Sequence, residues 1–270
     1  MAPLPTVWII AAAAFLFTWI ASLPTRDTSW VDRLWSIVPV VYVWVFAGFA
    51  GLADARLNVM AVLVTLWGAR LTFNFARKGG YSGMEDYRWA VLRGRMSPAL
   101  FQVFNLLFIA LYQNILLVLI TLPALTAYEH RGTGFSVMDA VVATAFLAAL
   151  VGETVADQQQ WAFHRRKHAG GPEFRPRFLQ SGLWRYSRHP NFFFEQAQWW
   201  LFFLFGAIAA GSLLQWTVLG AVLLTALFAG STAFTEWITR GRYPEYAEYQ
   251  RSTSAIVPWF PRRSRVTATA

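Results

Sequence analysis

The sequence predicts an all-α, polytopic membrane protein with seven transmembrane helices, its N-terminus outside and its C-terminus in the cytoplasm. Composition is the first reason, since 56% of the 270 residues are hydrophobic and only 14% are charged, whereas about a quarter of the residues of soluble domains are charged. The second reason is a series of apolar runs of about 20 residues, the length that crosses a bilayer. The third is a one-sided distribution of Lys and Arg among the loops.

Seven apolar runs follow one another along the chain. No Lys or Arg precedes the first run, which distinguishes it from a signal peptide. The last apolar block, from Phe192 to Trp237, is too long for one span, and we expect Gly211 and Ser212 to divide it. The expected spans are about 7–23, 34–53, 57–75, 101–127, 137–156, 192–210 and 213–237. Without internal repeats or a soluble segment, residues 1–270 are expected to form a single integral membrane domain.

The charges of the loops predict the orientation. Segments 24–33, 76–98 and 157–190 and the tail from Thr239 fall on one side of the membrane and carry 20 of the 23 Lys and Arg residues. Because positively charged loops remain in the cytoplasm, we expect these segments there. The membrane thereby explains the net charge of +9 without a nucleic-acid partner. The chain has no cysteine and only four scattered histidines, so no disulfide and no metal site are expected.

The most distinctive stretch is 182–191 (GLWRYSRHPN), which is followed by Glu195. Guanidinium groups such as those of Arg185 and Arg188 match phosphate oxygens, and the Tyr and Ser hydroxyls between them can complete such a site. The proline suits the first turn of a helix, whose N-terminus favours anions. Asn191 offers both a donor and an acceptor to a carboxamide. This stretch therefore predicts an anion-binding site beside a membrane helix.

Attraction of anionic lipid headgroups is the alternative interpretation of these basic segments. It requires positive charge, but not a Tyr, His, Pro and Asn in a fixed order. We therefore prefer it for Arg165–Lys167 and for the tail Arg262–Arg265, and not for 182–191.

Ionisable and polar side chains also occur within the expected spans, where they are costly and usually face a cavity or a partner. Glu153 and Asp157 lie one turn apart on the fifth span and share a face. The set at similar depth comprises Arg70, Glu153, Asp157, Glu195 and Glu236, and Asn74 and Gln198 are polar neighbours on the same helices. Each residue alone could belong to a buried ion pair that fixes the helix bundle. As a set beside the basic loop, they favour a functional cavity.

Stretch 182–191 with Glu195 resembles the signature of the DUF1295 proteins, which belong with the steroid 5-alpha-reductase C-terminal superfamily. Segments 153–159 (ETVADQQ) and 85–89 (EDYRW) resemble two other parts of that family, and the tail 236–258 resembles its closing helix and loop. The resemblance covers about residues 30–260 and is most specific in the second half.

This resemblance implies a membrane reductase that uses NADPH. Its reaction would transfer a hydride to the β-carbon of a polarised C=C bond in a lipid-soluble substrate, either steroid-like or another enone or enoyl compound. The residues that the resemblance places around the cofactor are Arg70, Arg77, Asp157, Arg185, Tyr186, Arg188, His189, Asn191, Glu195, Glu236 and Arg240.

The sequence departs from the steroid reductases in the catalytic pair. Those enzymes place a Glu on the second helix and a Tyr on the third, whereas here the second offers Ser36 and Asp32. Asp32 can alternatively cap that helix. The third helix offers Trp67, whose indole donates a hydrogen bond but is not an acid. Tyr87 in the following loop is a candidate replacement, so Tyr87, Ser36 and Asp32 are the candidate catalytic residues.

Two other function classes fit parts of the pattern. Membrane methyltransferases of the isoprenylcysteine carboxyl methyltransferase type carry an Arg-His-Pro motif before a late helix and bind S-adenosylmethionine. That cofactor lacks phosphate, so a site rich in arginine favours NADPH. The other class is a non-catalytic, lipid-binding membrane protein.

The expected partners are a lipid-soluble small molecule and membrane lipids. The expected location is a membrane, the inner or plasma membrane if the protein is bacterial, with the cofactor site facing the cytoplasm.

Overall fold

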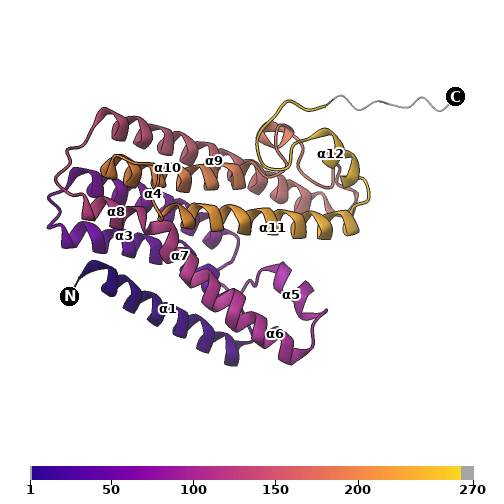
Figure 1. The fold of residues 1–270 in the computed structure, drawn as a ribbon. Helices are drawn as coiled ribbons and strands as arrows, with labels where there is room; N and C mark the ends of the chain where they lie inside the picture. The colour runs from indigo at the N-terminus through magenta and orange to yellow at the C-terminus, as the bar shows by residue number, and fades with distance from the viewer. Residues whose placement is uncertain (1, 263–270) are drawn as a thin grey trace. The chain divides into compact units, whose positions relative to one another are not determined.

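The computed structural model describes residues 2–262, which form helices and connecting loops with no β-strand in that range (Figure 1). Seven helical stretches are long and apolar enough to cross a membrane, which confirms the predicted all-α class and number of spans. They are Pro3–Thr25, Trp30–Phe49, Ala55–Arg77, Pro98–Glu129, Val137–Ala169, Pro190–Ala210 and Val218–Arg242. The orientation of the termini stays a prediction.

The described chain groups into two compact units. Residues 2–147 and 199–224 belong to the first unit, and residues 148–198 and 225–262 belong to the second. Arg263 and Arg265 of the basic tail lie outside the described residues.

The first unit contains most of the N-terminal helices. They are α1 (Pro3–Thr25), α2 (Trp30–Trp35), α3 (Val38–Phe49), α4 (Ala55–Arg77), α5 (Tyr87–Arg93), α6 (Pro98–Phe104), a π-helical segment (Asn105–Tyr112), α7 (Gln113–Thr121) and α8 (Pro123–Glu129). The second expected span therefore consists of two helices, α2 and α3, with Ser36 at the C-cap of α2. Residues up to 147 of α9 (Val137–Ala169), from 199 of α10 (Pro190–Ala210) and up to 224 of α11 (Val218–Arg242) complete this unit.

Small residues allow close approach of helices in the first unit. A Cβ added to Gly68 of α4 would lie 2.5 Å from the carbonyl oxygen of Ser36, and one added to Gly220 of α11 would lie 2.2 Å from that of Leu119. Glycine at such positions lets backbones pack closely in membrane bundles. A buried ion pair adds to this packing, because Arg56 Nε donates to Asp139 Oδ1 over 2.7 Å and both side chains are almost fully buried.

The end of α10 follows the expectation from the sequence. The helix ends at Ala210, and Gly211 adopts a positive φ of 65°, a conformation that favours glycine. Helix α11 begins at Val218 and not at residue 213, because the intervening segment forms turns in which Leu214 is 94% exposed.

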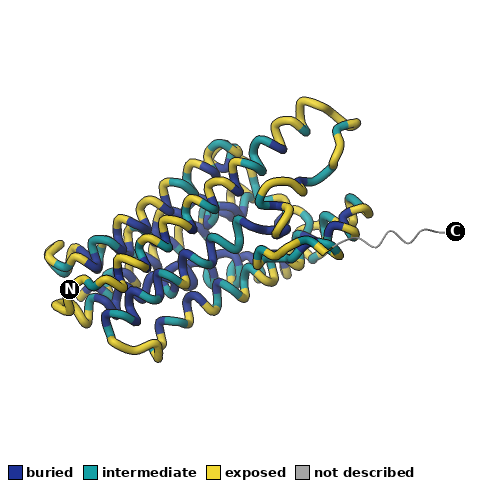
Figure 2. The backbone as a smooth tube through the Cα atoms, turned by 90° about the horizontal axis from the view of Figure 1, so that it is seen from above, coloured by how far each residue is buried: buried dark blue, intermediate teal, exposed yellow. Residues whose placement is uncertain are grey.

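The second unit contains the remaining parts of α9, α10 and α11, together with α12 (Tyr246–Ser252) and two 3₁₀ turns (Gly171–Glu173 and Gly182–Arg185). Helix α9 continues to Ala169, although the sequence predicted a span ending near residue 156 and a polar loop after it. Phe163 explains this extension, since it is buried and packs with Leu179 and Trp184. Figure 2 shows buried and exposed positions alternating along individual helices, as expected for helices with one packed face.

Candidate functional site

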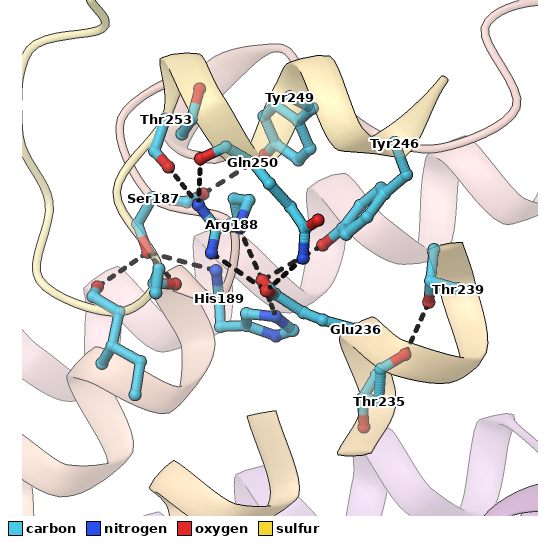
Figure 3. A network of polar contacts seen from close by, with 12 residues as sticks. Ser187, Arg188, His189, Thr235, Glu236, Thr239, Tyr246, Tyr249, Gln250 and Thr253 are labelled. Carbon is cyan, nitrogen blue, oxygen red and sulfur yellow. Dashed lines mark hydrogen bonds and ion pairs between the residues drawn. The ribbon is translucent and has the colours of Figure 1, made fainter. Parts of the chain in front are cut away.

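A carboxylate on α11 is the centre of a polar network in the second unit (Figure 3). Arg188 donates to both oxygens of Glu236, with Nε 2.6 Å from Oε1 and Nη2 2.9 Å from Oε2. His189 Nε2 lies 3.1 Å from Oε1, and Gln250 Nε2 donates to Oε2 over 2.8 Å. Glu236 is only 7% exposed, so this set of donors compensates the burial of its charge.

All the hydrogen-bonding nitrogens of the Arg188 guanidinium are engaged within the protein. Arg188 Nε and Nη2 donate to Glu236, and Nη1 donates to the backbone oxygens of Gln250 and Thr253. Burial alone would lower the pKa of Arg188, but the hydrogen bonds and charge of Glu236 outweigh it and raise that pKa above its ordinary value. This geometry gives Arg188 a role in holding the second unit together. Its contact with a cofactor phosphate stays a prediction.

The C-terminal strap, which we define as residues 253–259, pairs with the motif through its backbone. Arg188 N donates to the Ser254 carbonyl over 2.8 Å, and His189 N donates to the Ala255 carbonyl over 3.1 Å. Ser187 and Ser254 form an isolated parallel β-bridge. The strap therefore fixes the backbone that leads into α10.

Two tyrosines that the sequence did not identify as site residues complete the network. Tyr246 OH donates to Glu236 Oε1 over 3.3 Å, and Tyr249 OH donates to the backbone oxygen of Trp184. Burial raises the pKa of both tyrosines, so their hydroxyls keep the protons that these hydrogen bonds require. Their spacing of three residues places both on one face of α12, and this spacing is the signal in the sequence.

Three other predicted cofactor residues are exposed to solvent. Arg185, the last residue of its 3₁₀ turn, and Arg240 on α11 are exposed, and neither side chain has a hydrogen bond or ion pair within residues 2–262. Tyr186 is 38% exposed, and its ring lies 6.2 Å from that of Phe260. These side chains keep donors that a bound anion can use.

Helix α10 carries a polar stripe at its beginning. Asn191, Glu195 and Gln198 are spaced by four and three residues and therefore share one face. Gln198 is fully buried, and its Nε2 donates to Glu153 Oε2 of α9 over 2.6 Å. Asp157, one turn further along α9, is 3% exposed, and Glu195 is 5% exposed. Glu153, Asp157, Glu195 and Gln198 thus occupy buried positions in the second unit, whereas Asn191 is half-buried.

Three buried oxygens in this unit lack a hydrogen-bond partner among the described residues. They are Asn191 Oδ1, Gln198 Oε1 and Thr232 Oγ1. Buried polar atoms are normally paired, so such a group requires an explanation in terms of a ligand or an ordered solvent molecule. Thr232 lies one turn before Glu236 on α11, and the sequence alone did not single it out.

The remaining predicted cofactor residues, Arg70 and Arg77, lie on α4 in the first unit. Arg77 Nε and Nη2 donate to Asn74 Oδ1 over 2.9 and 2.7 Å, so part of this guanidinium is used within α4. Their part in binding a cofactor stays a prediction.

The candidate catalytic residues also lie in the first unit. The Ser36 hydroxyl lies 2.7 Å from that of Thr72, and Asp32 Oδ2 is buried without a hydrogen-bond partner among the described residues. Tyr87 is the first residue of α5 and is 53% exposed. Trp67 is fully buried, with its ring edge-to-face against Trp199 at 4.9 Å between centroids. Trp67 therefore serves the packing of this unit, and the proton donor stays a prediction.

Comparison with known proteins supports the resemblance seen in the sequence. The chain is 40% identical over 260 residues to a Schizosaccharomyces pombe protein described as "Uncharacterized protein C594.04c", with 89% of this chain and 75% of the relative covered. No solved structure matches this chain. The family model described as "Protein of unknown function (DUF1295)" matches residues 18–253. The chain therefore belongs to the DUF1295 family.

Proposed function

We propose that this protein is a membrane-embedded, NADPH-dependent reductase that acts on a polarised C=C bond of a lipid-soluble substrate. The observation that carries the proposal is the buried, unpartnered Oδ1 of Asn191 at the start of α10. This oxygen accepts an N–H, which the carboxamide of a nicotinamide supplies. The reduced nicotinamide supplies a hydride when bound, and it leaves oxidised.

The surrounding residues of the second unit fit the other parts of such a cofactor. Arg185 and Arg240 have guanidinium groups without partners among residues 2–262, and these groups suit phosphate oxygens. The first turn of α10 adds a helix N-terminus, which also favours anions. S-adenosylmethionine has no phosphate to use these cations, so the exposed arginines favour the reductase over a methyltransferase.

The fixed network behind the motif supports binding by preorganisation. Glu236 holds the imidazole of His189, and the C-terminal strap holds the backbone of residues 187–189. A site whose side chains are already held loses less conformational entropy when a ligand binds. The strap and the network therefore place Asn191 and Arg185 relative to each other before any ligand arrives.

Ligand-dependent melting of the detergent-purified protein tests the proposal. A ligand that binds the folded state alone raises the melting temperature, and we expect this for NADPH and not for S-adenosylmethionine. Replacing Asn191 by Leu is expected to weaken NADPH binding about tenfold, because a hydrogen bond to a buried group is lost.

Asn58→Leu is the matched control. Its Oδ1 is also buried and unpartnered, but it lies on α4 in the first unit and has no part in the proposed site. NADPH binding by this variant is expected to equal that of the wild type. Stabilisation by S-adenosylmethionine alone, or equal NADPH binding by Asn191→Leu, would refute the proposal.

A further inference from the structure

A cluster of three cations surrounds a tyrosine after the end of α11 in the second unit. Lys167 Nζ donates to Tyr243 OH over 3.1 Å and lies 4.7 Å from the centroid of the Tyr243 ring. The guanidinium of Arg177 lies 5.5 Å from the same centroid. Arg242 precedes Tyr243 in the chain and contributes its charge to this tyrosine.

No carboxylate of the described residues forms an ion pair with these cations. Lys167, Arg177 and Arg242 form no ion pair within residues 2–262. Elsewhere in the second unit the contrast is clear, because Arg188 is paired with Glu236 at 2.6 Å. Three like charges gathered without a counter-ion repel one another, so the arrangement favours an anion that brings more than one negative charge.

Hydrogen bonds to neutral carbonyl groups and ring contacts hold the cluster in place, and they leave its positive charge unneutralised. Lys167 Nζ also donates to the Arg177 carbonyl over 2.5 Å, and Arg177 Nη1 donates to the Pro172 carbonyl. The Phe178 ring contacts both tyrosines, with its centroid 6.3 Å from that of Tyr243 and 4.9 Å from that of Tyr246. These interactions orient Lys167 and Arg177 without neutralising them, as a preformed anion site requires.

The titration of Tyr243 is consistent with the same electrostatics. Burial would raise the pKa of Tyr243, but the hydrogen bond from Lys167 and the charges of Lys167, Arg242 and Arg177 lower it below its ordinary value. A positive potential that favours the phenolate also favours a phosphate at this place.

We infer that Lys167, Arg177 and Arg242, together with the Tyr243 hydroxyl, form a binding site for a phosphate monoester. A monoester dianion carries two negative charges and three terminal oxygens, which match several converging cations better than a singly charged phosphodiester. If the proposed function holds, this group is the 2′-phosphate that distinguishes NADPH from NADH. The site then determines cofactor specificity.

The length of α11 is compatible with this assignment. Thr232, with its unpartnered hydroxyl, and Arg242 are ten residues apart on the same helix, a separation of about 15 Å at 1.5 Å per residue. An extended dinucleotide can reach from one end of this stretch to the other.

Binding of NADPH and NADH to single variants tests the inference. In Lys167→Gln and Arg242→Gln we expect affinity for NADPH to fall about tenfold, the effect of losing one charged hydrogen bond, with NADH affinity unchanged. Arg251→Gln is the matched control, because Arg251 is an exposed arginine on α12 without described side-chain contacts. Equal losses for both nucleotides, or no loss for either, would overturn the specificity role.

A second arm separates this inference from the proposed function. Adenosine 2′,5′-bisphosphate and AMP differ by the 2′-phosphate alone, so stabilisation by the former and not by the latter supports the site even if NADPH is not turned over. Stabilisation only by vesicles of phosphatidylglycerol, or by none of these probes, would refute a phosphate monoester site. Stabilisation by the vesicles alone would mean that the cations bind anionic lipid headgroups.

Discussion

Replacing Arg188 by Ala tests the role that the structure gives to the centre of the motif. The change removes two hydrogen bonds to Glu236, at 2.6 and 2.9 Å, and two to backbone carbonyls. It leaves a carboxylate that is only 7% exposed without its main counter-charge. Breaking a buried ion pair from one side costs about 3–5 kcal/mol. Because His189 and Gln250 still contact Glu236, we expect a loss of about 3 kcal/mol, at the lower end of that range.

The assay combines thermal melting without ligand and amide hydrogen exchange of the C-terminal strap. Arg185→Ala is the matched control, because this exposed arginine is three residues away and has no described partner. A surface change of this kind is expected to alter stability by no more than about 0.5 kcal/mol. The double variant Arg188→Leu with Glu236→Leu is expected to be more stable than Arg188→Ala, since no uncompensated charge remains. If Arg188→Ala melts like the control and its strap exchanges no faster, the structural role is wrong.

Two further predictions concern other charged groups. The pKa of Tyr243 is lowered in the folded protein. The stability that its ionised form contributes is therefore fully present above the unfolded pKa of about 10, and it is lost as pH falls through the folded pKa. An ultraviolet titration should therefore show one tyrosine ionising early, absent in Tyr243→Phe and shifted upward in Lys167→Gln; a single ordinary transition would contradict this. Arg56→Ala should destabilise the first unit by about 3–5 kcal/mol in denaturant unfolding, since it leaves the buried carboxylate of Asp139 without its counter-charge. Equal unfolding midpoints would show that this ion pair contributes nothing.

The number of spans was predictable because it depends on local composition. Each apolar run is about as long as a bilayer is thick, and this length signal needs no knowledge of tertiary contacts. The division at Gly211 was visible for a similar reason, since glycine suits the left-handed conformation that ends a helix. By contrast, the continuation of α9 to Ala169 depends on the burial of Phe163 against Leu179 and Trp184, which are distant in sequence.

The partners of the motif were not predictable from local pattern. Arg188 contacts residues of α12 and the strap that lie about sixty positions away, and no periodicity connects such segments. Composition indicated only that a buried Arg and a buried Glu need partners. The sequence therefore identified Arg188 and Glu236 as important, but it could not separate a residue that holds the site from one that contacts a ligand.

That separation follows from the physical cost of leaving a buried charge unpaired. Arg188 donates from Nε, Nη1 and Nη2 to Glu236 and to two carbonyls, which leaves one N–H on Nη2. A two-pronged contact with a phosphate would therefore require it to give up bonds, and breaking those to Glu236 would leave that buried carboxylate without its counter-charge. Arg185 and Asn191 face no such cost, because the guanidinium of one and the Oδ1 of the other have no described partner. The motif therefore combines two kinds of residue. Buried residues that fix the backbone stand between residues whose polar atoms remain available, and a ligand binds most favourably to the second kind.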